Sequence, residues 1–237
     1  MSFNFSPKIV KDGLVLYLDA ANTKSYVSGS TTWSDISTGL NDGLLVNGPT
    51  FSSTNYGNII FDGVNDYTSF LTNPNLYFSG TSPYTLSVFA NIVTQPPINV
   101  FSGFINREYG SPRNGYNLWF CRDTNPLMTS IASERFGVGS GQRLTFVTLN
   151  NSDCIGVWNQ YTVTYDGTNL RFYLNGEFKH SASASGDITN TTGTLEIGRR
   201  QTDYGNCRIS STLIYNKALS QSEVSQNYNT LKSRFKL

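Results

Sequence analysis

Two turn-forming dipeptides place the strongest constraint on the fold of this chain. Asp166-Gly167 and Asn175-Gly176 lie on either side of a short segment in which apolar and polar residues alternate. Asp, Asn and Gly accept the positive φ angles that a tight turn requires, and such turns join neighbouring antiparallel strands. The segment from residue 163 to residue 177 is therefore predicted to contain consecutive strands joined as hairpins.

The same alternation recurs along the chain, between clusters of Gly, Asn, Ser, Thr and Pro. A period of two is typical of half-buried antiparallel strands. About twelve strands with almost no helix predict an all-β sandwich or barrel, and no change of composition divides residues 13–237 into separate domains. The predicted strands span residues 14–19, 58–62, 67–70, 86–92, 99–105, 116–122, 130–136, 144–149, 159–165, 170–174, 195–199 and 208–215.

One helix is predicted near the C-terminus. Ser220 and Glu223 have the spacing of a capping box, in which each side chain bonds the backbone N–H of the other residue. Val224, Tyr228 and Leu231 follow at intervals of four and three residues, which places them on one face of a helix. We expect this apolar face to pack on the sandwich.

The charge of the chain excludes two classes of partner. Only 14% of the residues are charged, and 17 Lys and Arg against 16 Asp and Glu leave a net charge of +1. Binding to nucleic-acid phosphates requires a basic stripe, which this sequence lacks. Its apolar stretches are also shorter than the roughly 20 residues of a membrane-spanning helix. Neither nucleic-acid binding nor membrane insertion is expected.

The N-terminus and the cysteines bear on where the protein is found. The first residues lack the basic start and apolar centre of a secretory signal, so we expect the protein to be made and kept in a cytoplasm until something else carries it out. Cys121, Cys154 and Cys207 are odd in number and widely spaced, which fits neither a disulfide framework nor a zinc site. They are expected to be reduced thiols in or near the core.

Several longer motifs resemble a known family. The sequence is similar to the concanavalin A-like (laminin G-like) jelly rolls, in particular to those of tailed-phage structural proteins such as cyanophage proteins. The resemblance implies a jelly-roll sandwich of two antiparallel sheets with one short C-terminal helix. Residues 80–155 match least, and partner-specific loops are expected there. The matching motifs are residues 12–22, 32–36, 47–51, 60–67, 158–176, 195–198, 214–223 and 227–235.

The resemblance includes glucanases, but the residues argue against catalysis. Retaining glycosidases use two carboxyl groups about 5 Å apart, and the laminarinase-type pattern Glu-x-Asp-x-x-Glu is absent from this sequence. His180 is the only histidine, so nucleophilic catalysis through an imidazole is also not expected. The glutamates are scattered along the chain at Glu108, Glu134, Glu177, Glu196 and Glu223.

No cofactor is required by this interpretation, but calcium is a candidate. Asp62, Asn65 and Asp66 gather three oxygen-bearing side chains near the end of a predicted strand, and calcium prefers such oxygen ligands. The alternative is ordinary turn chemistry, in which these side chains bond their own backbone.

Glycan binding is a second activity that the resemblance implies. A predicted loop and the strand after it carry aromatic rings for stacking on a sugar, together with Arg and Asn donors. The alternative is that Tyr116 and Trp119 are core or edge residues of a strand. The candidate glycan or partner residues are Arg107, Tyr109, Arg113, Asn114, Tyr116 and Trp119.

Residues 1–12 precede the first predicted strand and carry Phe3, Phe5 and Pro7 in a polar context. They are a candidate N-terminal docking arm for a neighbouring subunit; the alternative is that they lie along the sandwich.

The resemblance leads to one main functional hypothesis and one alternative. The main hypothesis is a non-enzymatic phage virion structural protein, a capsid decoration protein that binds the major capsid protein or other neighbouring subunits on the virion surface after assembly in the host cytoplasm. A neutral surface rich in Ser, Thr and Asn suits such contacts, and a homotrimer is a further hypothesis. The alternative is a module of a tail fibre or tail tip that binds a cell-surface glycan or receptor.

Overall fold

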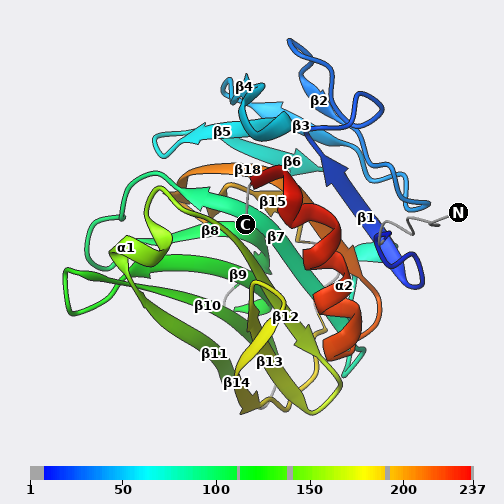
Figure 1. Cartoon of the computed structure of the whole chain (residues 1–237). Helices are drawn as coiled ribbons and strands as arrows, with labels where there is room; N and C mark the ends of the chain where they lie inside the picture. The colour runs from blue at the N-terminus through cyan, green and yellow to red at the C-terminus, as the bar shows by residue number, and fades with distance from the viewer. Residues whose placement is uncertain (1–7, 111–112, 138–140, 190–192, 236–237) are drawn as a thin grey trace, which may run out of the picture.

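The computed structural model describes residues 8–110, 113–137, 141–189 and 193–235. These residues form two antiparallel sheets that face each other, with a helix on one side (Figure 1). The architecture confirms the predicted all-β sandwich with one short C-terminal helix. None of the described helices is long and apolar enough to cross a membrane.

Sheet A comprises, in spatial order, β14 (Glu177–Ser183), β13 (Asn169–Leu174), β12 (Trp158–Tyr165), β7 (Tyr84–Ile92), β18 (Asn206–Tyr215), β5 (Asn58–Asp62) and β4 (Thr50–Ser52), and β1 (Leu14–Asp19) also pairs with β18. Sheet B comprises β11 (Gly141–Asn150), β10 (Met128–Gly137), β9 (Asn114–Arg122), β8 (Phe101–Tyr109), β15 (Glu196–Ile197), β6 (Tyr67–Phe70), β3 (Gly43–Val46) and β2 (Thr32–Trp33). The remaining elements are the hairpin β16 (Arg199–Arg200) and β17 (Asp203–Tyr204), the helices α1 (Asn151–Cys154) and α2 (Gln221–Leu231), and the 3-10 turns η1 (Thr54–Tyr56), η2 (Pro74–Leu76) and η3 (Lys232–Phe235).

The two dipeptide turns form as predicted. Strands β12 and β13 pair across the first turn, and β13 and β14 pair across the second. Gly167, Asn175 and Gly176 all have positive φ angles. The second turn is followed by β14, which was not among the predicted strands. Most of its side chains are exposed, so its sequence shows no alternation of buried and exposed residues.

The core lies between the sheets and is rich in aromatic rings. At one end Tyr84 contacts the rings of Phe78, Tyr116 and Tyr165, with centroid distances of 5.2 to 5.4 Å. These rings are buried, and fully burying one aromatic side chain is worth about 1.5–3 kcal/mol. The three cysteines are unpaired and buried, as expected.

Helix α2 covers the outer face of sheet A (Figure 1). Its capping box forms between Ser220 and Glu223, and Val224 and Leu231 are buried against that face. The helix therefore occupies one of the two outer faces of the sandwich and leaves the outer face of sheet B for other contacts.

The described part of the N-terminal segment lies beside this helix. The backbone N–H of Val10 donates to Asn227, and the carbonyl of Val10 accepts from the Tyr215 hydroxyl. Residues 8–10 thus pack along the sandwich. The predicted arm residues Phe3, Phe5 and Pro7 lie outside the described residues, so the docking role of residues 1–12 stays a prediction.

Residues 80–155 contain five of the predicted strands. This segment forms five long strands, β7 to β11, each nine or ten residues in length. These five strands were predicted, with shorter bounds, and the role of the loops between them in partner contacts stays a prediction. Strands β2, β3, β4, β16 and β17 were also missed, because two to four residues are too few to show a period of two.

Candidate functional site

The outer face of sheet B points away from the core and gathers polar side chains. On β9, Tyr116 and Leu118 belong to the core between the sheets, whereas Trp119 packs in a separate cluster on the other face. Asn117 alternates with the core residues and stands opposite Asn106 of β8. Neighbouring strands therefore bring residues that are distant in the sequence onto one surface.

The β16-β17 hairpin lies against this surface, next to β8. Gly103 of β8 makes the close approach possible, because a Cβ at this position would stand 2.2 Å from the carbonyl oxygen of Arg199. Any larger residue would push the hairpin away from the sheet. Clefts lie on both sides of the hairpin, since its residues line each of them.

A buried ionic network fastens the hairpin to the sheet. Arg200 donates from Nε to Glu108 over 3.1 Å and from Nη2 to Glu134 over 2.7 Å. The side-chain amide of Asn117 donates to the same two carboxylates, at 2.9 and 3.3 Å. The side chains of Arg200, Glu108 and Glu134 are each at most 5% exposed, so solvent does not screen these contacts.

Sequence reasoning missed this network and treated its glutamates as scattered. Arg200 is 92 positions from Glu108 and 66 from Glu134. Nothing in the local sequence marks the three residues as partners, because only the pairing of β8, β9 and β10 brings the two glutamates together. Arg113 and Gln201 add further contacts to the second oxygen of Glu108.

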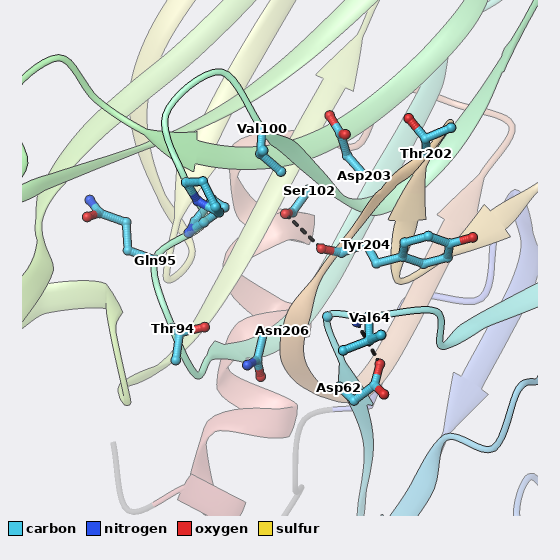
Figure 2. A pocket seen from close by; sticks show the side chains of 13 residues that line it. Asp62, Val64, Thr94, Gln95, Val100, Ser102, Thr202, Asp203, Tyr204 and Asn206 are labelled. Carbon is cyan, nitrogen blue, oxygen red and sulfur yellow. Dashed lines mark hydrogen bonds between the residues drawn. The ribbon is translucent and has the colours of Figure 1, made fainter.

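The first cleft, which we call the Tyr204 cleft, has a volume of about 390 Å³. It lies between the loop after β5, the loop between β7 and β8, and the hairpin (Figure 2). Figure 2 shows the Ser102 hydroxyl donating to the Tyr204 carbonyl on one wall, with Asp62 on another. The lining residues are Asp62, Gly63, Val64, Thr94, Gln95, Pro96, Pro97, Val100, Ser102, Thr202, Asp203, Tyr204 and Asn206.

The Tyr204 cleft is acidic in character. Asp203 accepts a hydrogen bond from the backbone N–H of Phe101, which fixes its position. Burial raises the pKa of Asp62, but the backbone N–H groups of Val64, Asn65 and Asp66 outweigh it and lower that pKa overall. Within the described residues, neither Asp62 nor Asp203 forms an ion pair, and no basic side chain lines the cleft.

The candidate calcium residues form a turn at the edge of this cleft. Oδ1 of Asp62 accepts from the N–H groups of Val64, Asn65 and Asp66, and Oδ2 of Asp66 accepts from the N–H of Asp62. This is the turn chemistry that the sequence offered as the alternative. In the part of the chain that the structure describes, no group of three or more acidic, Cys or His side chains is arranged for a metal ion. Calcium binding stays a prediction.

The second cleft, which we call the Asn106 cleft, has a volume of about 380 Å³ and lies on the other side of the hairpin. Asn106 is 2% exposed, and its Oδ1 has no hydrogen-bond partner among the described residues. An ion pair between Glu196 and Arg199 forms one wall, and Arg199 also lies over the Tyr67 ring. The lining residues are Asn106, Glu108, Gly110, Thr194, Glu196, Arg199 and Gln201.

Two of the predicted glycan residues face the interior. Tyr116 is fully buried and donates its hydroxyl hydrogen to the carbonyl of Leu76. Arg107 is 1% exposed and lies 4.1 Å from the centre of the Tyr77 ring. Neither side chain can stack on or bond a sugar in this structure, so the prediction was wrong for both. Side chains alternate between the two faces of a strand, and these two positions of β8 and β9 fall on the inner face.

Two of the other predicted glycan residues, Arg113 and Trp119, lie toward the outer face. Arg113 is half-exposed and pairs with Glu108, and the Trp119 ring packs beneath Arg200 and beside Phe101. Asn114, the first residue of β9, accepts from the N–H of Thr189 and donates to the Thr189 hydroxyl, which links the strand to the segment that contains Thr189. The side chain of Tyr109 lies outside the described residues. The structure thus divides the predicted patch and does not bring all six residues together.

Solved structures with the same arrangement of strands are clostridial toxin domains. The binding domain of Paraclostridial mosquitocidal protein 1 has a TM-score of 0.73 and 18% identity, with 93% of this chain and 52% of that chain covered. The botulinum neurotoxin serotype D binding domain has a TM-score of 0.70 and 18% identity, with 92% and 51% covered. The botulinum neurotoxin type G receptor-binding domain has a TM-score of 0.66 and 16% identity, with 92% and 51% covered.

The chain spans about half the length of these toxin domains, and at such low identity the likeness establishes the fold alone. No curated protein sequence matches the chain significantly. A family model matches residues 62–225, which is more than half of the chain. The chain therefore belongs to the concanavalin A-like lectin/glucanase superfamily.

Proposed function

We propose that this chain is a non-enzymatic binding module that recognises a glycan of a cell-surface receptor through the Tyr204 cleft. The observation that carries the proposal is the combination, in one open cleft, of an aromatic ring with two carboxylates that have no basic partner among the described residues. The proposal is the alternative that the sequence left open, and not its main hypothesis of capsid decoration.

The chemistry of the cleft suits a sugar. The hydroxyl groups of a pyranose donate hydrogen bonds, and the carboxylates of Asp62 and Asp203 and the amide of Asn206 can accept them. The apolar face of a sugar ring packs on aromatic and aliphatic surface, which Tyr204 and Val64 provide. Binding pockets commonly combine such apolar walls with a few polar groups that fix orientation.

The solved structures support a binding role. The similar domains are named as binding or receptor-binding domains of clostridial toxins. Their likeness to this chain lies in the fold, and this chain corresponds to about half of each. The ligand and its site therefore depend on the residues of this chain.

The state of the paired glutamates supports a role without catalysis. Glu108 and Glu134 lie on the outer face of sheet B and share the donors Asn117 and Arg200, so they are close together. A glycosidase needs one protonated carboxyl group to donate to the leaving oxygen and one free carboxylate to attack the sugar. Here Arg200 holds both groups in ion pairs and shields them from solvent. Neither group is available for either role.

A glycan array followed by variants of Tyr204 tests the proposal. The array should yield binding to at least one glycan, and Tyr204→Ala should weaken that binding roughly fivefold, because a ring contact is worth about 1 kcal/mol. Tyr204→Phe keeps the ring and should retain binding. The matched control is Tyr56→Ala, which removes a tyrosine that is 74% exposed at the end of η1. An array without any binding, or equal affinities for the Ala variants of Tyr204 and Tyr56, would refute the proposal.

The resemblance to tailed-phage proteins suggests what carries this module. We propose a tail fibre or tail tip, where contact with a host glycan is made, as the location. Cryo-electron microscopy of intact particles tests it: density at fibre ends supports the location, whereas density over the whole capsid supports decoration through capsid proteins. Assembly as a homotrimer stays a prediction that mass photometry of the purified chain can check.

A further inference from the structure

Arg135 places a fully buried guanidinium group inside the sandwich. It lies on β10 in the same phase as the core residue Ile131, at the end of the core where β7 begins and β12 ends. Its Nη2 donates to the backbone carbonyls of Gly80 and Gly186, and its Cζ lies 4.4 Å from the centre of the Tyr165 ring. These contacts leave its Nε and Nη1 without a hydrogen-bond partner.

Arg135 also lacks a counter-charge. All 16 Asp and Glu residues of the sequence lie in the described parts of the chain, and none of them forms an ion pair with Arg135 there. A guanidinium stays protonated in proteins, and a buried charge is costly unless it is paired. Two carbonyl groups and one ring compensate this charge only in part, which points to a partner from outside the chain.

The hydroxyl of Tyr84 is a second buried donor beside this charge. Tyr84 is fully buried, its ring centre lies 5.4 Å from that of Tyr165, and its hydroxyl has no hydrogen-bond partner among the described residues. Burial raises the pKa of Tyr84, whereas the nearby charge of Arg135 acts in the opposite direction. The two residues thus place donors that lack acceptors in one enclosed part of the core.

The chemistry of these groups favours an anion over a water molecule. A guanidinium only donates hydrogen bonds, whereas a water molecule has two hydrogens that need acceptors of their own. The carbonyl of Gly80 already accepts from Arg135 and from the backbone N–H of Ile188. An anion needs donors alone, and it supplies the missing negative charge.

The enclosure of the site selects a small anion with a single charge. Arg135 and Tyr84 are fully buried, and neither of them lines the Tyr204 cleft or the Asn106 cleft. Sulfate or phosphate would bring more acceptor oxygens than these groups can satisfy, and a second negative charge would stay unpaired beside one guanidinium. A halide ion carries one charge and has no further atoms to accommodate.

We infer that a halide ion, chloride under ordinary conditions, binds in the core between the guanidinium of Arg135 and the hydroxyl of Tyr84 and accepts hydrogen bonds from both. The ion would join β10 to β7. Through the contacts of Arg135 it would also steady the segments that contain Gly80 and Gly186. This site is separate from the Tyr204 cleft, and the inference does not depend on glycan binding there.

Bromide can locate the ion directly, because it replaces chloride and scatters X-rays anomalously. Protein purified and crystallised with sodium bromide in place of sodium chloride should show an anomalous peak between Arg135 and Tyr84. Bromide is present from purification onward because the enclosed site opens only when the protein does. Peaks on the surface alone, which would mean an adventitious ion only, would overturn the inference, and so would the absence of any peak.

Urea unfolding measures the affinity in solution. The free energy of unfolding should rise with chloride concentration at constant ionic strength, with gluconate as the replacing anion because it is too large for the site. Tyr84→Phe removes a hydroxyl that has no protein partner, so the variant should fold. It should raise the Kd for chloride roughly tenfold or more, because a hydrogen bond to a charged group contributes at least that factor. The matched control is Tyr26→Phe, at a buried tyrosine that packs on Phe51, and it should leave the Kd unchanged.

Arg135→Met should abolish the dependence on chloride, because it removes the positive charge. Should this variant fail to fold for want of its contacts with Gly80 and Gly186, the comparison of Tyr84→Phe with Tyr26→Phe decides the question. A free energy of unfolding that does not respond to chloride in the natural chain would overturn the inference. An equal Kd for chloride in the two tyrosine variants would overturn it as well.

Discussion

Arg200 and Glu134 form a buried ion pair, with Nη2 of the arginine 2.7 Å from Oε2 of the glutamate. The arginine belongs to the short β16-β17 hairpin and the glutamate to β10 of sheet B. The pair therefore ties the hairpin across the outer face of the sheet, between the two clefts that its residues line.

Replacing Arg200 by Ala should destabilise the protein strongly. The change leaves the carboxylates of Glu108 and Glu134 buried and without their shared counter-charge, and losing one partner of a buried ion pair costs about 3–5 kcal/mol. Urea unfolding at neutral pH measures the loss. Arg171→Ala is the control, because Arg171 pairs with Asp166 at the surface and such pairs contribute about 0–1 kcal/mol. Equal losses in the two variants would contradict the importance of the buried network.

Replacing Ser220 by Ala should weaken α2. Ser220 accepts from the backbone N–H of Glu223 and its own N–H donates to the Glu223 side chain. Loss of such an N-cap costs about 1 kcal/mol. Because α2 packs on sheet A, the loss should appear in the free energy of global unfolding by urea. Ser233→Ala, at an exposed serine beyond the helix, should change it little. A Ser220 variant as stable as the Ser233 variant would show that the cap contributes nothing.

Asp166 should contribute stability that depends on pH. Burial raises the pKa of Asp166, but the N–H groups of Asn169 and Thr168, the Thr168 hydroxyl and Arg171 outweigh it and lower that pKa well below its usual range. In the unfolded chain the carboxyl titrates at about 4, so acid protonates the unfolded state first. The contribution is therefore complete above the unfolded pKa and is lost as the pH falls toward the folded pKa.

Urea unfolding of the Asp166→Asn variant at pH 7 and pH 3 checks this expectation. The variant should be less stable than the natural chain at pH 7, and the difference should shrink at pH 3. Asp187→Asn, at an exposed carboxylate on another loop, provides the comparison. A difference for Asp166 that grows as the pH falls would contradict the sign of this argument.

Calcium should raise the melting temperature if the turn at Asp62, Asn65 and Asp66 binds the ion. Excess chelator should reverse the rise, and Asp66→Asn should abolish it, because the variant removes a carboxylate ligand. Differential scanning fluorimetry with calcium, with magnesium and with chelator measures the effect. A melting temperature that responds to none of them would leave these residues with their turn contacts alone.

The local features of the fold could be predicted from the sequence. The turns at Asp166-Gly167 and Asn175-Gly176 and the capping box at Ser220 and Glu223 form as expected. Each depends on residues within four positions of one another, so the short segment contains nearly all the energy that decides its conformation. The longer strands could also be predicted, because their apolar residues alternate with a period of two.

The candidate site could be predicted only in part. Alternation implies that β9 has an inner and an outer face, but both phases of its sequence carry an aromatic residue, with Tyr116 in one and Trp119 in the other. In the structure Tyr116 faces inward, as does Arg107 of the neighbouring strand. A bulge in β8 between Gly103 and Ile105 shifts the register of β8 against β9. A shift of one residue moves every following side chain to the opposite face, which no local pattern reveals.

Tertiary structure alone decided what the outer face of sheet B carries. The sequence by itself determined that this chain forms hairpins, a two-sheet sandwich and a capped helix, because these depend on near neighbours and on the period of apolar residues. Strands that are many residues apart pair with one another, and this pairing brings Glu108, Glu134 and Arg200 together. It also forms the two clefts that residues of the β16-β17 hairpin line. Long-range register, and not local propensity, places those side chains within hydrogen-bond distance.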